Sequence, residues 1–293
     1  MKISEIIRRI EAYHPDLGAA YQGCDGIKAG NPDQECTGVV SALVPTVEVI
    51  RKTASLGCNL LYVHEPTSYL SPDFPDWKAA FPCHVFEEKK KLLNDAGIVV
   101  YRDHDHAHAH RPDSIFTGVI RYLGWESYVQ KTSAIPYGYL IALPKAQSVR
   151  DLNRLLIEKT GANGIRYIGD PNTMVKRLAL VGHIYPGAFV SEHFENDCYD
   201  DYPTRIIRAM EENHIDAVLP GEIVEWNLLS YIRDAGAFGE SKVCFNLGHF
   251  NWEQLGSRFA VDWLKDLLHQ EVPITWIPTG DIWKFQLPEG QDV

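Results

Sequence analysis

The sequence predicts an α/β fold built around parallel strands, on the basis of two observations. First, short apolar runs of strand length alternate with stretches of helical periodicity along most of the 293 residues. This alternation is typical of βαβ units, which place their strands in parallel. Second, histidines and carboxylates directly follow several of the apolar runs, where α/β proteins carry their chemistry. The same pattern therefore indicates both the fold and the region in which a site is expected.

The first half of the chain shows the βαβ pattern most clearly, because strand, helix and strand follow one another between residues 37 and 63. Pro15 lies just beyond the expected helix at 3–13, and the helical periodicity within 44–59 stops at Gly57, as is typical of helix-ending residues. In order, we expect a helix at 3–13, a series of turns at 23–35, a strand at 37–44, a helix at 44–59, a strand at 60–63, a Pro-rich loop at 67–84, a helix at 85–96 and a strand at 98–101.

The second half repeats the alternation after a weakly patterned stretch at 126–137. We therefore expect an N-terminal half, 1–130, and a C-terminal half, 131–293. In order, the second half predicts a strand at 137–143, a helix at 148–160, strands at 165–168 and 175–182, a loop at 185–203, a helix at 203–213, a strand at 217–219, a helix at 223–235, a strand at 242–247, a long helix to about 269 and a strand at 274–277.

Composition narrows the class of protein. The net charge of −11 argues against a nucleic-acid partner, which would need a basic surface, and is compatible with divalent cations. The six cysteines form no C-x-x-C pair, which fits a reducing cytoplasm better than a disulfide scaffold. The N-terminal residues form an amphipathic pattern rather than a signal peptide, and no run of about 18 apolar residues predicts a membrane span.

The stretch 101–114 carries four of the twelve histidines at every second position, namely His104, His106, His108 and His110. An extended chain would point all four imidazoles to one face. A helical chain would instead pair the first with the third and the second with the fourth. At least two imidazoles converge in either conformation, which favours a metal site. The alternative is a solvated histidine-rich loop.

Two further strand ends carry the same residue types. His64 and Glu65 follow the strand at 60–63, and His249 with Glu253 follows the strand at 242–247. Imidazoles and carboxylates together suit Zn, Mn, Fe or a similar divalent ion, and this many can hold two ions. Taken singly, His64 could be a structural histidine and Glu253 a favourable acid at a helix start.

The residues near His249 also predict how the following helix begins. Asn251 is expected to be its N-cap, with Gln254 as the capping-box partner. Glu253 would then lie in the first turn and have no capping role. Glu222, which follows the strand at 217–219, is a candidate general base or, alternatively, a carboxylate at another helix start.

Several motifs resemble the Nif-three-like family, whose members are often labelled GTP cyclohydrolase 1 type 2-like. The matching segments are Asp25–Gly30, the strand-helix-strand 42–66, Tyr101 with His104, His108 and Gly118, the strand 173–182, Gly221-Glu222, and Gly248-His249-Phe250 with Glu253. This chain departs from the family pattern at two of the positions. Glu65 replaces a histidine, and His108 replaces a metal-bridging aspartate.

The resemblance implies two intertwined α/β halves with a dinuclear metal centre between them. By resemblance, the metal ligands are His64, Glu65, His108, His249 and Glu253. They would hold two divalent ions per chain, drawn from Zn, Mn, Fe and Ni. The resemblance also implies a ring-shaped homohexamer.

Two functions are compatible with these features. The first is a metal-dependent hydrolase acting on a small molecule such as a nucleotide, in which His104 or His106 orients a ligand or carries a proton and Glu222 is a base. The second is a non-catalytic metal-binding or protein-interaction ring. The sequence has neither a P-loop nor a G-x-G-x-x-G motif, so it contains no phosphate-binding fingerprint.

Overall fold

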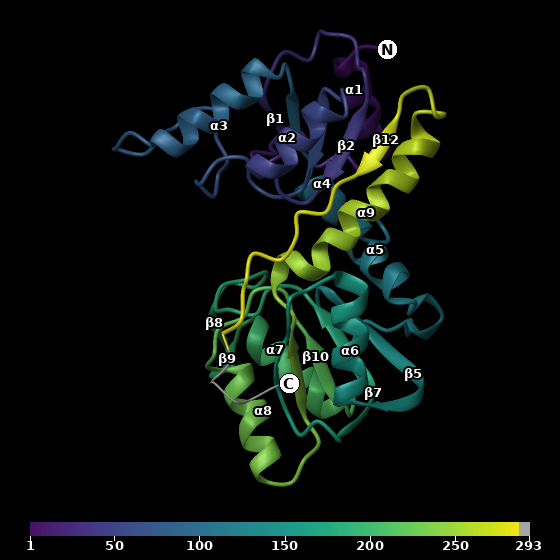
Figure 1. Cartoon of the computed structure of the whole chain (residues 1–293). Helices are drawn as coiled ribbons and strands as arrows, with labels where there is room; N and C mark the ends of the chain where they lie inside the picture. Colours follow the sequence, from purple (N-terminus) through teal and green to yellow (C-terminus); the bar gives the residue numbers. More distant parts are fainter. Residues whose placement is uncertain (287–293) are drawn as a thin grey trace. The chain divides into compact units, whose positions relative to one another are not determined.

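Two five-stranded sheets organise the computed structural model of the chain, which describes residues 1–286 (Figure 1). Unit 1 comprises Met1–Val119 and Glu253–Thr279 and contains the first sheet. Unit 2 comprises Ile120–Trp252 together with the described residues from Gly280 onward, and contains the second sheet. Both sheets are accompanied by helices, which confirms the predicted α/β class.

The sheet of unit 1 is parallel except at one edge, where β1 runs antiparallel to β4. The prediction of turns alone at 23–35 was wrong for the residues of β1, because pairing with a strand distant in sequence draws them into the sheet. The strand order is β1 (Gly26–Ala29), β4 (Val99–Arg102), β3 (Leu60–Val63), β2 (Val39–Ala42) and β12 (Ile274–Trp276).

Both faces of this sheet are buried, which explains why its strands read as continuous apolar runs. Val39, Leu60 and Val99 lie in one core cluster with residues of α1 and α9. Their sequence neighbours Val40 and Leu61 lie in another core cluster with residues of α2 and α3. The helices are α1 (Ile3–Tyr13), α2 (Val47–Ser55), α3 (His84–Asp95), α4 (Asp105–Ala109), α5 (Ser114–Leu123) and α9 (His249–Leu267).

The sheet of unit 2 has three central parallel strands and antiparallel strands at both edges. Its order is β5 (Gly138–Ser148), β7 (Met174–Val181), β10 (Ala217–Leu219), β11 (Val243–Asn246) and β6 (Arg166–Ile168). Its helices are η1 (Glu126–Tyr128), α6 (Val149–Thr160), α7 (Tyr202–Glu212) and α8 (Leu228–Ala237). Apolar residues of α7 and α8 and of the strands form one buried cluster.

A small hairpin, β8 (His193–Glu195) and β9 (Cys198–Asp200), lies in the region expected to be an irregular loop. That expectation was wrong for these six residues. Asn196 and Asp197 form the two-residue connection, and both have positive φ angles of 51° and 61°. Asn and Asp tolerate this conformation better than other non-glycine residues, so the pair is a hairpin signal that was present in the sequence.

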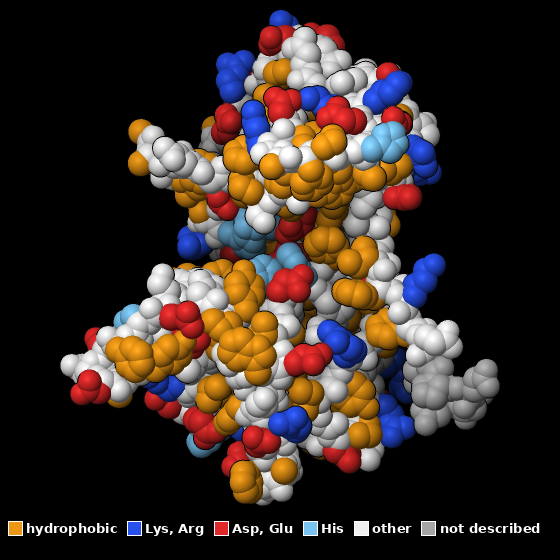
Figure 2. All heavy atoms as spheres, turned by 90° about the vertical axis from the view of Figure 1, so that its left-hand side faces the viewer, with side chains coloured by type: hydrophobic (Ala, Val, Ile, Leu, Met, Phe, Trp, Pro, Cys, Tyr) orange, Lys and Arg blue, Asp and Glu red, His pale blue; other side chains and the backbone are white. Residues whose placement is uncertain are grey.

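Charged side chains of both signs are interspersed with hydrophobic ones on the face drawn in Figure 2. Within residues 1–286, no helix is long and apolar enough to cross a membrane. The exposed hydrophobic side chains include Phe81, Phe194, Phe238 and Trp283.

Candidate metal centre

The histidine-rich stretch adopts the helical alternative. After β4 the chain forms the short helix α4, in which the His108 amide donates to the His104 carbonyl and the His110 amide donates to the His106 carbonyl. Asp25 caps this helix from a distant part of the sequence. Its carboxylate oxygens accept the amides of His104, Asp105 and His106 at 2.6, 3.0 and 2.9 Å. The residues before β1 therefore fix where α4 begins.

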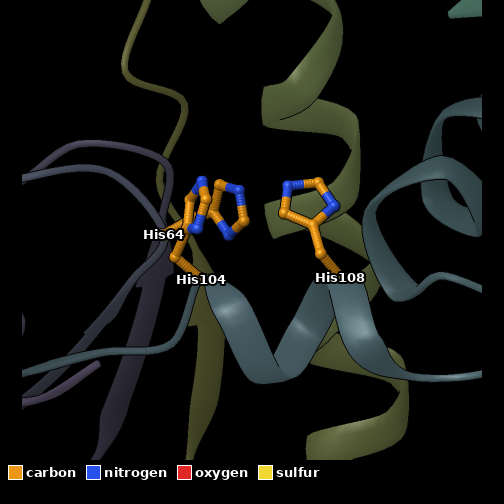
Figure 3. A group of neighbouring side chains, drawn as sticks. All are labelled: His64, His104 and His108. Carbon is orange, nitrogen blue, oxygen red and sulfur yellow. The ribbon is translucent and has the colours of Figure 1, made fainter. Parts of the chain in front are cut away.

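Three imidazoles lie together at the carboxyl edge of the unit 1 sheet (Figure 3). His64 follows β3, and His104 and His108 are one helical turn apart at α4. The His64 ring centroid lies 4.5 Å from that of His104 and 4.9 Å from that of His108, and the last two centroids are 4.9 Å apart. Each ring offers a ligand nitrogen within 4.8 Å of the others.

The Nδ1 atom of each of these rings is occupied by an oxygen acceptor. His64 Nδ1 is 3.0 Å from the Asp103 carbonyl, His104 Nδ1 is 2.7 Å from Asp105 Oδ1, and His108 Nδ1 is 2.9 Å from Asp113 Oδ2. A proton on each Nδ1 satisfies these contacts and leaves Nε2 as the lone-pair atom. Metal-binding histidines are oriented in this way by oxygen acceptors behind them.

Two buried carboxylates complete the group. Glu65 and Glu253 are 7% and 2% exposed, and each offers an oxygen within 4.8 Å of a ligand atom of His64. His64 Nε2 lies 3.7 Å from Glu253 Oε2 and has no hydrogen-bond partner among the described residues, although it is buried. A buried nitrogen lone pair next to buried carboxylates fits a divalent cation. Unit 1 therefore brings together five candidate ligands, His64, Glu65, His104, His108 and Glu253.

The surroundings of His64 and His108 shift their pKa values in opposite directions. Burial lowers the pKa of His64 well below its ordinary value, and His104 and His108 lower it further, so His64 is neutral. Burial also opposes the charged form of His108, but Asp113, Glu253 and Glu65 outweigh it and raise the His108 pKa to about 9. Negative charge near His108 therefore favours a cation, whether a proton or a metal ion.

A buried polar network holds the loop that carries His64 and Glu65. Arg102 Nε donates to the His64 carbonyl at 2.9 Å, and Lys89 Nζ donates to the Thr67 carbonyl at 2.6 Å. The Ser68 amide donates to Asp73 Oδ1 at 2.7 Å. Burial lowers the pKa of Lys89 to about 8. These bonds satisfy backbone groups that would otherwise be buried without partners, and they fix the direction of the loop.

Unit 2 gathers a second group of the same residue types at the carboxyl edge of its own sheet. His183 follows β7, Glu222 follows β10 and His249 follows β11. The Glu222 amide donates to His183 Nδ1 at 2.9 Å, and Glu222 Oε1 lies 3.4 Å from His249 Nδ1. The His183 and His249 ring centroids are 4.5 Å apart. Gly221 makes this approach feasible, since a Cβ there would lie 2.6 Å from His183 Nδ1.

The prediction that Asn251 caps the helix after β11 was wrong. Helix α9 begins at His249, so Asn251 lies inside it, and its side-chain amide donates to the Leu247 carbonyl at 2.8 Å. His249 and Glu253 are consequently one turn apart on one helix. The sequence pattern predicts neither His183 nor Asp113 as a site residue. His183 could have been found from its position directly after a strand, whereas the pairing of Asp113 with His108 required the structure.

A family model decides the relationship of this chain to known proteins. The model of Duf34/NIF3, NGG1p interacting factor 3, matches residues 1–188, which is more than half of the sequence. The chain belongs to the Duf34/NIF3 family. The resemblance inferred from the sequence motifs is thereby confirmed.

Two proteins named GTP cyclohydrolase 1 type 2 homolog are similar to this Duf34/NIF3 chain. The one from Clostridium perfringens is 25% identical over 193 residues, which span 62% of this chain and 69% of that protein. The one from Streptomyces coelicolor is 28% identical over 188 residues, which span 62% of this chain and 65% of that protein.

Solved structures support the same fold for this Duf34/NIF3 chain. Staphylococcus aureus protein SA1388 has a TM-score of 0.69 at 16% identity, covering 98% of this chain and 99% of that one. A Bacillus cereus protein related to NIF3 has a TM-score of 0.66 at 14% identity, with the same coverage of both chains. At these identities the likeness is one of fold alone.

Proposed function

We propose that this Duf34/NIF3 chain binds divalent metal ions through His64, Glu65, His104, His108 and Glu253, and that the bound metal supports hydrolysis of a small molecule. One observation carries the metal proposal: three imidazoles converge with Nδ1 engaged by oxygen acceptors. Neutral His64 with its buried Nε2 is already in the protonation state that a metal ligand requires.

We extend this proposal to a further ligand and to a second metal ion. His249 precedes Glu253 by one turn of α9, and we propose it as another ligand for a pair of Zn, Mn, Fe or Ni ions. Mixed imidazole and carboxylate ligands are compatible with all four metals. The helical pairing of His104 with His108 supports a ligand role for His104 in addition to the proton-carrying role predicted from the sequence.

The reaction class follows from what such a site supplies. A bound divalent ion would lower the pKa of a water molecule and stabilise negative charge at the reacting centre. Asp105 and Asp113 keep His104 and His108 oriented through their Nδ1 atoms. Glu222, whose side chain is 64% exposed, is the candidate base that would accept a proton from the substrate or from water. The GTP cyclohydrolase name of two relatives suggests a nucleotide as the first substrate to test.

The metal proposal is tested by elemental analysis of the purified chain after dialysis and reconstitution with each of the four metals. We expect at least one ion per wild-type chain. His64→Gln and His108→Gln should lower the affinity by about tenfold to a hundredfold or more. His84→Gln is the matched control, because its side chain is 85% exposed on α3. Wild-type chain that takes up none of the metals would refute the proposal.

Catalysis is tested separately with the metal-loaded chain against nucleotides, esters and amides. Turnover that is lost in His64→Gln and retained in His84→Gln supports the hydrolase. A fully loaded chain without turnover on any of these compounds favours the non-catalytic metal-binding ring instead. We also propose that the chain forms a homohexamer, as the family resemblance implies.

A further inference from the structure

A pocket in unit 2 has the composition of a ligand site. It includes none of the five candidate ligands of unit 1, but Glu222 and His249 of the proposed function line it. Its cavity volume is about 110 Å³. Asp281, Ile282 and Trp283 line it together with residues of the loops after β10 and β11. The residues used below are Arg166, Glu222, Asn246 and Trp283, and all of them line the pocket.

Hydrogen bonds hold the backbone of Trp283 in place. The Trp283 amide donates to Asp281 Oδ1 at 2.8 Å, and the Asn163 amide donates to the other oxygen of Asp281 at 2.8 Å. The Asn163 side chain donates to the Trp283 carbonyl at 2.7 Å. The backbone of Trp283 is therefore fastened to the loop after α6, although its side chain is 61% exposed. An exposed tryptophan on a fixed backbone is suited to stacking against a flat ligand.

The polar groups of the pocket offer opposite hydrogen-bonding capacities. The Arg166 guanidinium can only donate, the Glu222 carboxylate can only accept, and the Asn246 amide can do both. A ligand that satisfies all three must carry donors and acceptors. Nucleobase-type rings combine a flat face with donors and acceptors at the edge, and proteins read them by stacking and by edge hydrogen bonds.

We propose that this pocket binds a planar nitrogen heterocycle of the nucleobase type, which stacks on Trp283 and is held at its edge by Arg166, Glu222 and Asn246. The binding groups are all side chains of unit 2, so the proposal does not require a metal ion. It rests in part on the proposed function, because the candidate base Glu222 and the proposed ligand His249 line the same pocket, and it names the ring class of the substrate. Binding in EDTA tests the pocket apart from the metal, so the failure of one proposal can be told from the failure of the other.

The proposal is tested by isothermal titration calorimetry of the full chain with adenosine, guanosine, cytidine and uridine, in EDTA and after metal loading. Ribose is the control ligand without a ring system. We expect saturable binding of at least one nucleoside under both conditions and no binding of ribose. Trp283→Ala should weaken that binding at least tenfold. Trp226→Ala is the matched control, because Trp226 is a similarly exposed tryptophan of unit 2, at 56%, that does not line the pocket.

Each remaining outcome counts against the proposal. Absence of binding by all four nucleosides at millimolar concentration would overturn it, as would equal affinities in wild type and Trp283→Ala. Binding that requires metal loading would place the ligand at the metal and overturn it as well. Circular dichroism of each variant verifies that the fold is retained.

Discussion

The three convergent histidines differ mainly in what lies behind them. A carbonyl oxygen holds His64, whereas carboxylates hold His104 and His108. The hydrogen bond from His104 lowers the pKa of Asp105, which therefore stays charged. Asp113 raises the pKa of His108, whereas burial lowers the pKa of His64, so two residues of one type acquire different proton affinities within one cluster.

The pair of His108 and Asp113 predicts a pH dependence of stability in the metal-free protein. The His108 pKa is about 9 in the folded chain, against about 6.5 for an unperturbed histidine. Its stabilising contribution is therefore complete below pH 6.5 and is lost as the pH rises through 9, by up to about 3 kcal/mol. Asp113→Asn should reduce this loss while the new side chain still caps α5, since Asp113 Oδ1 accepts the amides of Ile115 and Phe116.

The measurement is denaturant unfolding in EDTA at pH 6.5 and at pH 9 for wild type and Asp113→Asn. The difference between the two proteins isolates the contribution of the pair from other titrating groups. Parallel pH profiles would mean that Asp113 does not raise the His108 pKa.

Glu65 and His108 are the two positions at which this chain departs from the family pattern, which has a histidine and an aspartate there. We predict that these two residues affect metal affinity jointly. The charge of Glu65 contributes to the raised pKa of His108, which indicates that the two groups interact. We expect Glu65→His and His108→Asp each to change metal affinity. The change in the free energy of metal binding in the double variant should differ from the sum of the two single changes by roughly 0.5–3 kcal/mol, because ligands of one site are coupled. If the two single changes in metal-binding free energy simply add in the double variant, Glu65 and His108 do not share a metal site.

Among the secondary-structure elements, the short helix α4 depends on a residue outside itself. Five residues make a weak helix on their own. Asp25 offsets this by accepting three amides at its start and also lies 2.6 Å from His106 Nδ1. The spacing of His104 and His108, and with it the geometry of the candidate site, depends on this cap.

Asp25→Asn tests the dependence of α4 on its cap. The side-chain amide nitrogen that replaces Asp25 Oδ2 can accept neither the His106 amide nor the His106 Nδ1 proton. We therefore expect a loss of about 1–2 kcal/mol in the free energy of unfolding and weaker metal binding. Asp33→Asn, at an exposed turn, is the control. Thermal unfolding and metal titration are compared for the three proteins, and metal affinity unchanged by Asp25→Asn would show that the cap does not position the ligands.

At the scale of the whole molecule, each unit carries histidines and carboxylates at the carboxyl edge of its own parallel strands. Unit 1 contains His64 and His104, and unit 2 contains His183, Glu222 and His249. The net charge of −11 favours accumulation of cations around the chain, an effect that salt weakens.

The proposed homohexamer is a prediction for the assembled molecule. Sedimentation equilibrium should give a mass close to six times the 33.1 kDa of one chain. The same measurement in EDTA determines whether assembly depends on metal. A mass of one chain at all concentrations would contradict the proposal. A mass of two or three chains would contradict it as well and would show that the chain forms a dimer or a trimer instead.

Local patterns were sufficient to predict the α/β class, most elements and the strand ends where His64, His104 and His249 lie, because periodicity and helix-ending residues act over a few positions. Tertiary contacts decided the rest. They made β1 a strand, chose the helical form of the histidine stretch through Asp25, and placed Asp113 behind His108. They also gathered Glu253 with His64, although 189 positions separate the two in the sequence. Contacts between such distant residues depend on how the sheets and helices pack, which short stretches of sequence do not specify.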